Sequence, residues 1–192
     1  MKYYEVIVTG DLAQRDLCIV EDPPEGMGLE HVFIARGRKA APFFPADAKV
    51  FLRKERRGIK LGGLLGNLNG YFIGNGEVKK IIQEHSKGQE IEFLPFTLYN
   101  QKKRAHSQDY CFINPIGTFD CLDEKASGAK FDKDGDIITT TDLVLDKKKL
   151  AKAPNFFRIG KLPTKYVMSF TLAKALQDAG VTNVVGYEIE VK

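Results

Sequence analysis

The sequence has 192 residues, of which 43% are hydrophobic and 28% charged, and its formal net charge is +4. A chain of this length fits one domain that buries about 70% of the surface of its unfolded form, so its core needs no disulfide or metal. Three widely spaced cysteines without a CxxC pair argue against a disulfide framework or a zinc ribbon and indicate a reducing compartment. Neither a signal peptide nor an apolar run of membrane-spanning length is present. We therefore expect a cytoplasmic protein without a membrane partner.

The first part of the chain is expected to consist of strands and loops. Residues 2–9 alternate in character as a strand does, and "EDPPEGMG" at 21–28 is a loop because its prolines and glycines cannot continue regular structure. We interpret residues 1–60 as an N-terminal strand and loop region packed on the same domain as residues 61–192.

Two amphipathic helices are predicted, at about 75–86 and 169–179. Asn75 and Ser169 are suited to cap their first turns, and Gly88 and Gly180 to follow their last turns. Strand-like segments flank each helix, which gives two strand–cap–helix–strand units. Further strand candidates are 109–114, 117–122, 136–145 and 155–159. The sequence thus predicts an α+β fold with a strand-rich mixed sheet.

Two short motifs resemble ligand sites but fit turns better. "YFIGNGEVKK" places GxG between a strand and a helix, but a dinucleotide-binding turn needs a third glycine where Lys79 stands. "FDKDGD" starts like a calcium loop, but its glycine and the expected glutamate are out of place. The three histidines are scattered, so no metal ligand set and no catalytic constellation can be assembled.

The stretch "FDCLDEKAS" at 119–127 gathers several reactive side chains. Asp120 and Asp123 are three residues apart at a predicted strand end, so they need not converge as a general acid and base. Asp123 is suited to accept backbone N–H groups and shape a turn. We favour this structural role over a catalytic or ligand-binding site.

Four segments of the second half follow one another in a familiar order: "FINPIGTFDCLDEKAS", "LVLDKKKL", "NFFRIG" and "YVMSFTLAKALQDAGV". Their order and spacing resemble the Imm11 family of immunity proteins, over roughly residues 64–191. The matching positions are Leu122, Asp123 and Ser127, then Leu143 to Asp146, Phe157 and Arg158, and Ser169, Leu172, Ala175, Leu176, Ala179 and Gly180. Thr182-Asn183-Val184 departs from the Thr-Gly turn that is usual in the family.

The resemblance implies a non-catalytic protein that binds and neutralises a cognate toxin of a bacterial polymorphic toxin system. It supplies no catalytic residue, metal or cofactor. It gives Asp123, Ser127, Arg158, Ser169 and Gly180 structural roles.

The charges of the first 60 residues are segregated in a way that can steer a charged partner. The charged residues of 16–30 are all acidic, whereas those of 49–60 are mostly basic. Such segregation can attract a charged partner, but the two segments can equally pair with each other inside the fold. Both lie where the family resemblance is weakest. We therefore predict a partner-binding surface at Arg53, Lys54, Arg56, Arg57 and Lys60.

Two alternatives stay open. The chain could be a small-ligand-binding or enzymatic domain that uses Asp120 and Asp123. It could also bind nucleic acid, provided that the basic segments 53–60 and 102–104 share one surface, although acidic runs that interrupt the basic patches disfavour this.

Overall fold

The computed structural model describes residues 2–192 and confirms the α+β prediction. The helices are α1 (Val32–Ala35), α2 (Gly76–His85) and α3 (Phe170–Asp178), with 3-10 helices at Gly28–His31, Ala41–Phe43 and Lys149–Lys152. The side chains of Asn75 and Ser169 accept hydrogen bonds from the N–H groups of Val78 and Leu172, so both long helices begin at the expected caps.

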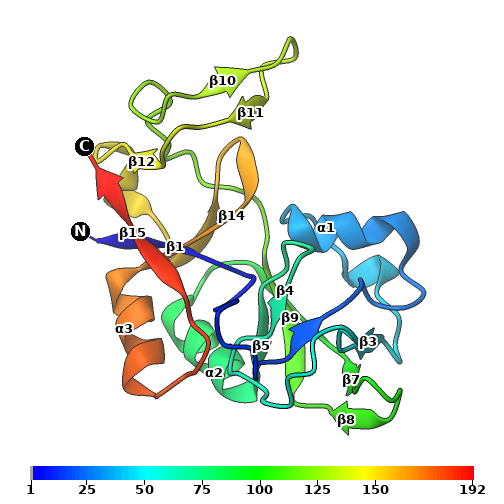
Figure 1. Ribbon diagram of the computed structural model, residues 1–192. Coiled ribbons are helices and arrows are strands. Elements are labelled where there is room, and N and C mark those ends of the chain that lie inside the picture. Colours follow the sequence, from blue (N-terminus) through cyan, green and yellow to red (C-terminus); the bar gives the residue numbers. More distant parts are fainter. Residues whose placement is uncertain (1) are drawn as a thin grey trace.

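The largest sheet joins the two ends of the chain. Its order is β12–β15–β1–β14–β13, from β12 (Val144–Leu145), β15 (Gly186–Val191), β1 (Tyr3–Val6), β14 (Leu162–Ser169) and β13 (Phe156–Ile159). The N-terminal strand β1 lies at the centre, antiparallel to both β14 and β15. The first residues of the chain therefore complete a sheet that is otherwise built from the last fifty (Figure 1).

A second sheet repeats the central arrangement of the first. It has the order β5–β9–β6, from β5 (Ile73–Asn75), β9 (Tyr110–Pro115) and β6 (Ile91–Pro95). Helix α2 connects β5 to β6, and both strands flank an antiparallel middle strand, as β14 and β15 flank β1 around α3. The two predicted strand–helix–strand units thus share one topology, and their helices pack against each other (Figure 1).

The remaining strands are short. They are the pair β2 (Ile19–Val20) with β4 (Gly66–Asn67), the sheet β3 (Lys49–Phe51)–β7 (Thr97–Tyr99)–β8 (Ala105–Ser107), and the hairpin β10 (Lys130–Phe131) with β11 (Ile137–Thr139). The hairpin projects from the body of the molecule (Figure 1).

Two strands that the sequence predicted, 117–122 and 136–145, are wrong. Residues 117–122 form no continuous strand, because Phe119 bridges Ile159 whereas Leu122 bridges Leu145, so the segment changes partner within three residues. Residues 136–145 divide into β11 and β12, since the two ends of this β-branched run pair in different sheets. Strand propensity was present in both segments, but a strand also needs one continuous partner.

The hydrophobic core consists of three clusters. One lies between the helices and the sheets and includes Val78 and Ile82 of α2 and Leu172 and Leu176 of α3, all fully buried. Burial of each such side chain stabilises the fold by about 1.5–3 kcal/mol. No helix in residues 2–192 is long and apolar enough to cross a membrane.

Candidate partner-binding surfaces

The segment 119–127 shapes the backbone. Oδ1 of Asp123 accepts a hydrogen bond of 2.9 Å from the N–H of Ala126, and the carbonyl of Asp123 accepts the N–H of Ser127. The buried hydroxyl of Ser127 accepts from the N–H of Val144 at 3.0 Å and lies 3.3 Å from the carbonyl of the same residue. Asp123 therefore closes a turn, and Ser127 joins that turn to β12.

Asp120 has a separate environment on the surface. Its side chain is 82% exposed and forms an ion pair of 2.9 Å with Lys149, whose pKa rises because of that hydrogen bond. Asp120 and Asp123 line the same shallow pocket of about 520 Å³, but each carboxylate has its own partner there. Across residues 2–192, no three His, Cys, Asp or Glu side chains come together as a metal would require.

The glycine and aspartate motifs are turns. A Cβ at Gly74 would lie 2.6 Å from Val78 Cγ1, so this glycine lets α2 pack against β5. Oδ1 of Asp132 accepts the N–H groups of both Asp134 and Asp136, which closes the tip of the β10–β11 hairpin.

The basic segment 49–60 runs beside the acidic segment 16–30. The N–H of Cys18 donates to the carbonyl of Lys60, and the N–H of Arg53 to that of Ile19, at 2.9 and 2.8 Å. Backbone hydrogen bonds thus place the two segments side by side. None of the ion pairs in the described part of the chain joins a side chain of one segment to a side chain of the other.

The predicted partner-binding residues differ in what they contact. The guanidinium of Arg56 donates to the carbonyls of Leu12 and Gln14, at 3.0 and 2.7 Å, and so holds the loop after β1. Arg53 forms an ion pair with Glu55 within the segment. We define the basic strip as Arg53, Lys54, Arg57 and Lys60, whose charged ends are not used to hold another segment.

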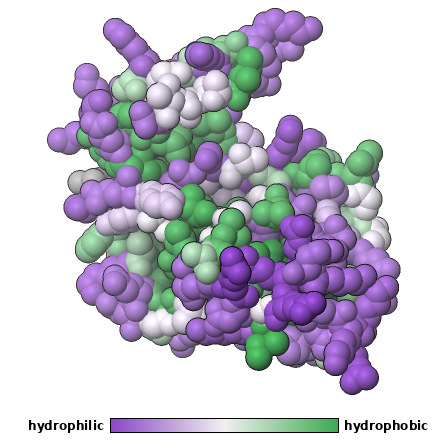
Figure 2. Space-filling model, viewed as in Figure 1, coloured by the Kyte–Doolittle hydropathy of each residue, from purple (hydrophilic) through white to green (hydrophobic). Residues whose placement is uncertain are grey.

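The basic strip and the turn 101–104 share one surface. Gln101 Nε2 donates to the carbonyls of Arg56 and Gly58, at 3.2 and 3.1 Å. Lys54 and Lys103 line one shallow pocket of about 220 Å³ together with three acidic residues, Glu21, Asp22 and Glu25. The surface therefore carries both signs of charge, and Figure 2 shows mainly hydrophilic side chains over β3, β7 and β8.

Arg158 is the largest fully buried side chain. Its guanidinium donates to six acceptors at 2.6–3.2 Å, namely the carbonyls of Ile34, Ala35, Pro115 and Pro163, Oδ1 of Asn114 and the hydroxyl of Tyr166. It also lies 4.0 Å from the ring centroid of Tyr166. Burial lowers the pKa of Arg158, but an arginine starts so high that it stays charged at neutral pH. Main-chain carbonyls, rather than a carboxylate, thus solvate this buried cation.

A second basic surface lies next to the buried Arg158. It is a groove of about 770 Å³ between the end of α1, the β13–β14 turn and β11, lined by Arg36, Arg38, Thr118, Asp136, Ile137, Ile138, Thr139, Thr140, Lys161, Leu162, Pro163, Thr164 and Lys165. Figure 2 shows the surface hollowed between the projecting hairpin and the part that contains α1. No sequence pattern predicted this groove, although "RGRK" at 36–39 places three cations around one glycine.

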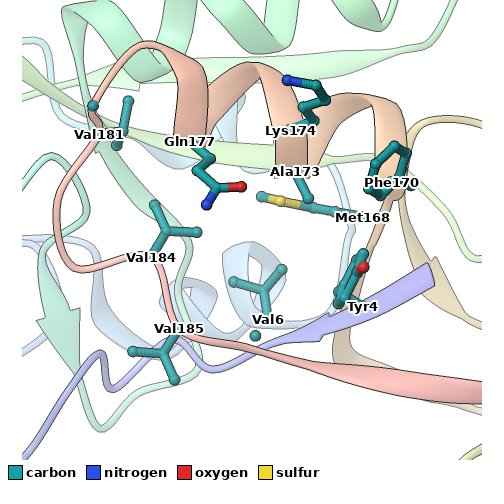
Figure 3. A pocket seen from close by; sticks show the side chains of 12 residues that line it. Tyr4, Val6, Met168, Phe170, Ala173, Lys174, Gln177, Val181, Val184 and Val185 are labelled. Atoms are coloured by element: carbon teal, nitrogen blue, oxygen red, sulfur yellow. The ribbon is translucent and has the colours of Figure 1, made fainter. Parts of the chain in front are cut away.

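A third hollow, of about 400 Å³, lies between α3 and the sheet. Figure 3 shows Val6, Met168, Val184 and Val185 around it, with the amide of Gln177 pointing from α3 toward the interior and Lys174 pointing away. These side chains suit an apolar group, and the residues that line the hollow include no Asp, Glu, His or Cys.

Comparison with known proteins assigns the family. The model of the immunity protein family Imm11 matches residues 7–191. A search of curated proteins found no match. The matched range begins just after β1 and includes the basic strip, Arg158 and both strand–helix–strand units. The chain therefore belongs to the Imm11 immunity protein family.

Proposed function

We propose that the protein binds a cognate bacterial toxin in the cytoplasm and neutralises it by contact, without catalysing a reaction. The observation that carries this proposal is the family match over residues 7–191. Immunity proteins as a class act on toxins, and the polar residues around position 120 have structural partners here.

The proposed contact surface includes the basic strip. Its cations stand beside acidic residues of the neighbouring segment, and such a mixed pattern discriminates between protein partners through charge complementarity. A stable complex of this kind buries on the order of 1,600 Å² in total, so the strip would be one part of the interface. Arg56 stands outside the proposed contact because its guanidinium holds the loop after β1.

A titration of toxin activity tests the proposal. The purified chain is added in increasing amounts to the toxin encoded by the adjoining gene. Neutralisation by contact predicts a linear loss of activity that is complete at a fixed molar ratio, together with a complex of that ratio in size-exclusion chromatography. Progressive inactivation by a small fraction of an equivalent would instead identify an enzyme.

The alternative function is nucleic-acid binding, because the basic strip and residues 101–104 lie on one surface, as this alternative requires. It predicts binding to duplex or single strands that weakens steeply with salt. Because acidic residues lie on the same surface, we expect no binding to nucleic acid, even at low salt.

A further inference from the structure

The groove next to Arg158 has two basic walls. Arg36 and Arg38 follow the end of α1, whereas Lys161 stands at the β13–β14 turn and Lys165 in the first half of β14. Only one acidic side chain, Asp136, lines the groove from within the described residues.

The charges of these walls differ in availability. Lys161 pairs with Glu124 at 2.7 Å, and Lys165 pairs with Glu5 at 2.6 Å. No ion pair in residues 2–192 includes Arg36 or Arg38, both of which are exposed, and Arg38 only stacks on the ring of Phe33. The α1 wall therefore presents two cations without a carboxylate partner.

Two strand segments line the groove as well, β11 and the start of β14. Strand β11 pairs only with β10. In β14, residues 163–165 have no partner in the register with β1 or β13, but Pro163 has no N–H and its carbonyl already accepts from Arg158, so the open edge of the groove is that of β11. Open strand edges accept a segment of extended backbone.

Arg158 fixes the groove before any partner arrives. Nη2 of Arg158 donates to the carbonyl of Ile34 in α1, and Nη1 donates to that of Pro163 at the start of β14, each at 2.6 Å. Gly37, between the two free arginines, has φ of +67°, and a Cβ there would lie 2.7 Å from Cδ of Arg158. One buried side chain thus holds two walls in place, and a preformed site loses less entropy on binding.

A polar network extends this support to the rest of the α1 wall. Asn114 Nδ2 donates to the carbonyl of Arg38 at 2.9 Å and to Glu92 at 3.0 Å. Glu92 in turn accepts the N–H groups of Ala40 and Ala41. The backbone that carries Arg36 and Arg38 is therefore clamped from Ile34 to Ala41.

We propose that this groove receives an extended segment of the partner in which acidic side chains alternate with apolar ones, an inference that rests on the proposed function. Successive side chains of an extended segment point to opposite sides. Carboxylates on one side meet Arg36 and Arg38, while apolar side chains on the other meet the exposed Ile138 of the hairpin. The exposed Ile138 favours a peptide over a phosphate backbone.

A peptide titration tests the groove without the toxin. The probe is the capped peptide Gly-Glu-Val-Glu-Val-Glu-Gly, added to the isotope-labelled full chain and followed by amide chemical shifts. The expected shifts concentrate in residues 36–38, 136–140 and 161–165, and the peptide with lysine in place of glutamate gives none. Absent shifts, or shifts centred on the basic strip, would overturn the inference. A single-stranded oligonucleotide that gives the same shifts more strongly would also overturn it.

A second arm uses the toxin. Arg36→Glu with Arg38→Glu is expected to weaken toxin binding at least tenfold, whereas Lys80→Glu with Lys87→Glu, the same charge change at exposed lysines outside the groove, leaves it unchanged. Arg36→Glu alone serves if loss of the Phe33 contact unfolds the double variant. If the wild type neutralises the toxin and the groove variant does so equally well, the inference fails alone. If the wild type does not bind the toxin, the proposed function fails, and with it the assignment of the segment to the toxin.

Discussion

Arg158 in β13 donates a hydrogen bond of 2.6 Å to the carbonyl of Ile34 in α1, across 124 positions of sequence. The same guanidinium reaches the hydroxyl of Tyr166, which in turn accepts the N–H of Phe72. One buried cation therefore ties the N-terminal helix, the loop before β5 and the C-terminal sheet together. This makes Arg158 the side chain on which the relative placement of these three parts depends.

Replacement of Arg158 by lysine or methionine is expected to destabilise the fold by about 3–5 kcal/mol, because either change leaves several buried carbonyls without a donor. Lysine has three donors on a single nitrogen and cannot span acceptors on three elements. Urea unfolding followed by circular dichroism measures the loss. The exposed Arg36→Ala variant is the control, with an expected change within about 0.5 kcal/mol. Equal stability of the lysine variant would contradict this role of the guanidinium fork.

Substitutions at Asp123 distinguish a turn from a reactive site. Asp123→Asn keeps the acceptor for the N–H of Ala126, so it is expected to fold with nearly wild-type stability and to neutralise the toxin normally. Asp123→Ala removes the acceptor and is expected to cost about 1 kcal/mol. Ser127→Ala leaves the N–H of Val144 without its buried partner and costs about 1–3 kcal/mol. Thermal unfolding measures all three variants. Loss of neutralisation in a stable Asp123→Asn variant would instead indicate that the carboxylate itself acts.

Charge reversal of Arg53, Lys54 and Arg57 is expected to slow toxin association at least about tenfold at low salt, because the basic strip would steer the encounter. The difference from wild type should shrink as salt rises, since exposed charges are screened. Stopped-flow binding measures the rate constant at several salt concentrations.

Arg56→Ala is the informative companion to that variant. The guanidinium of Arg56 holds the loop of Leu12 and Gln14, so its removal should lower the stability of the fold rather than the rate of toxin association. Equal association rates for the wild type and the reversed strip would remove the strip from the interface.

Local patterns in the sequence predicted the two long helices because everything that defines them lies within a few residues. Asn75 and Ser169 cap α2 and α3, and the apolar spacing of Val78 and Ile82 matches the buried face of α2. In α3 the buried face is formed by Leu172 and Leu176, whereas Phe170, which the spacing placed inside, is half exposed. The strand predicted at 117–122 failed because pairing is a property of distant segments, here Ile159 and Leu145.

The groove could not be predicted from the sequence for the same reason. Its walls come from residues 36–38, 136–140 and 161–165, and Arg158 brings two of them together through main-chain carbonyls. Carbonyls are common to every residue, so no side-chain pattern reveals which ones solvate a buried arginine. The sequence did carry a sign of the unusual site, since Arg158 interrupts the apolar run Phe156 to Ile159.

The three cysteines are expected to resist thiol reagents in the native protein. Cys18, Cys111 and Cys121 are buried and free, and burial raises the pKa of Cys111 to about 11 and that of Cys121 to about 12. The thiolate is the reactive form of a thiol. At pH 8 only about 0.1% of a thiol with a pKa of about 11 is thiolate, whereas about a quarter of an ordinary exposed thiol is. Labelling by a chromogenic disulfide at pH 8 should therefore be slow in buffer and complete, at three thiols, in urea. The rate in buffer should rise with pH, since a raised pKa shifts thiolate formation to more alkaline conditions. Rapid native labelling of Cys121 would show that the strand bridges around position 120 open readily, and that this part of the fold is less firmly packed than its burial indicates.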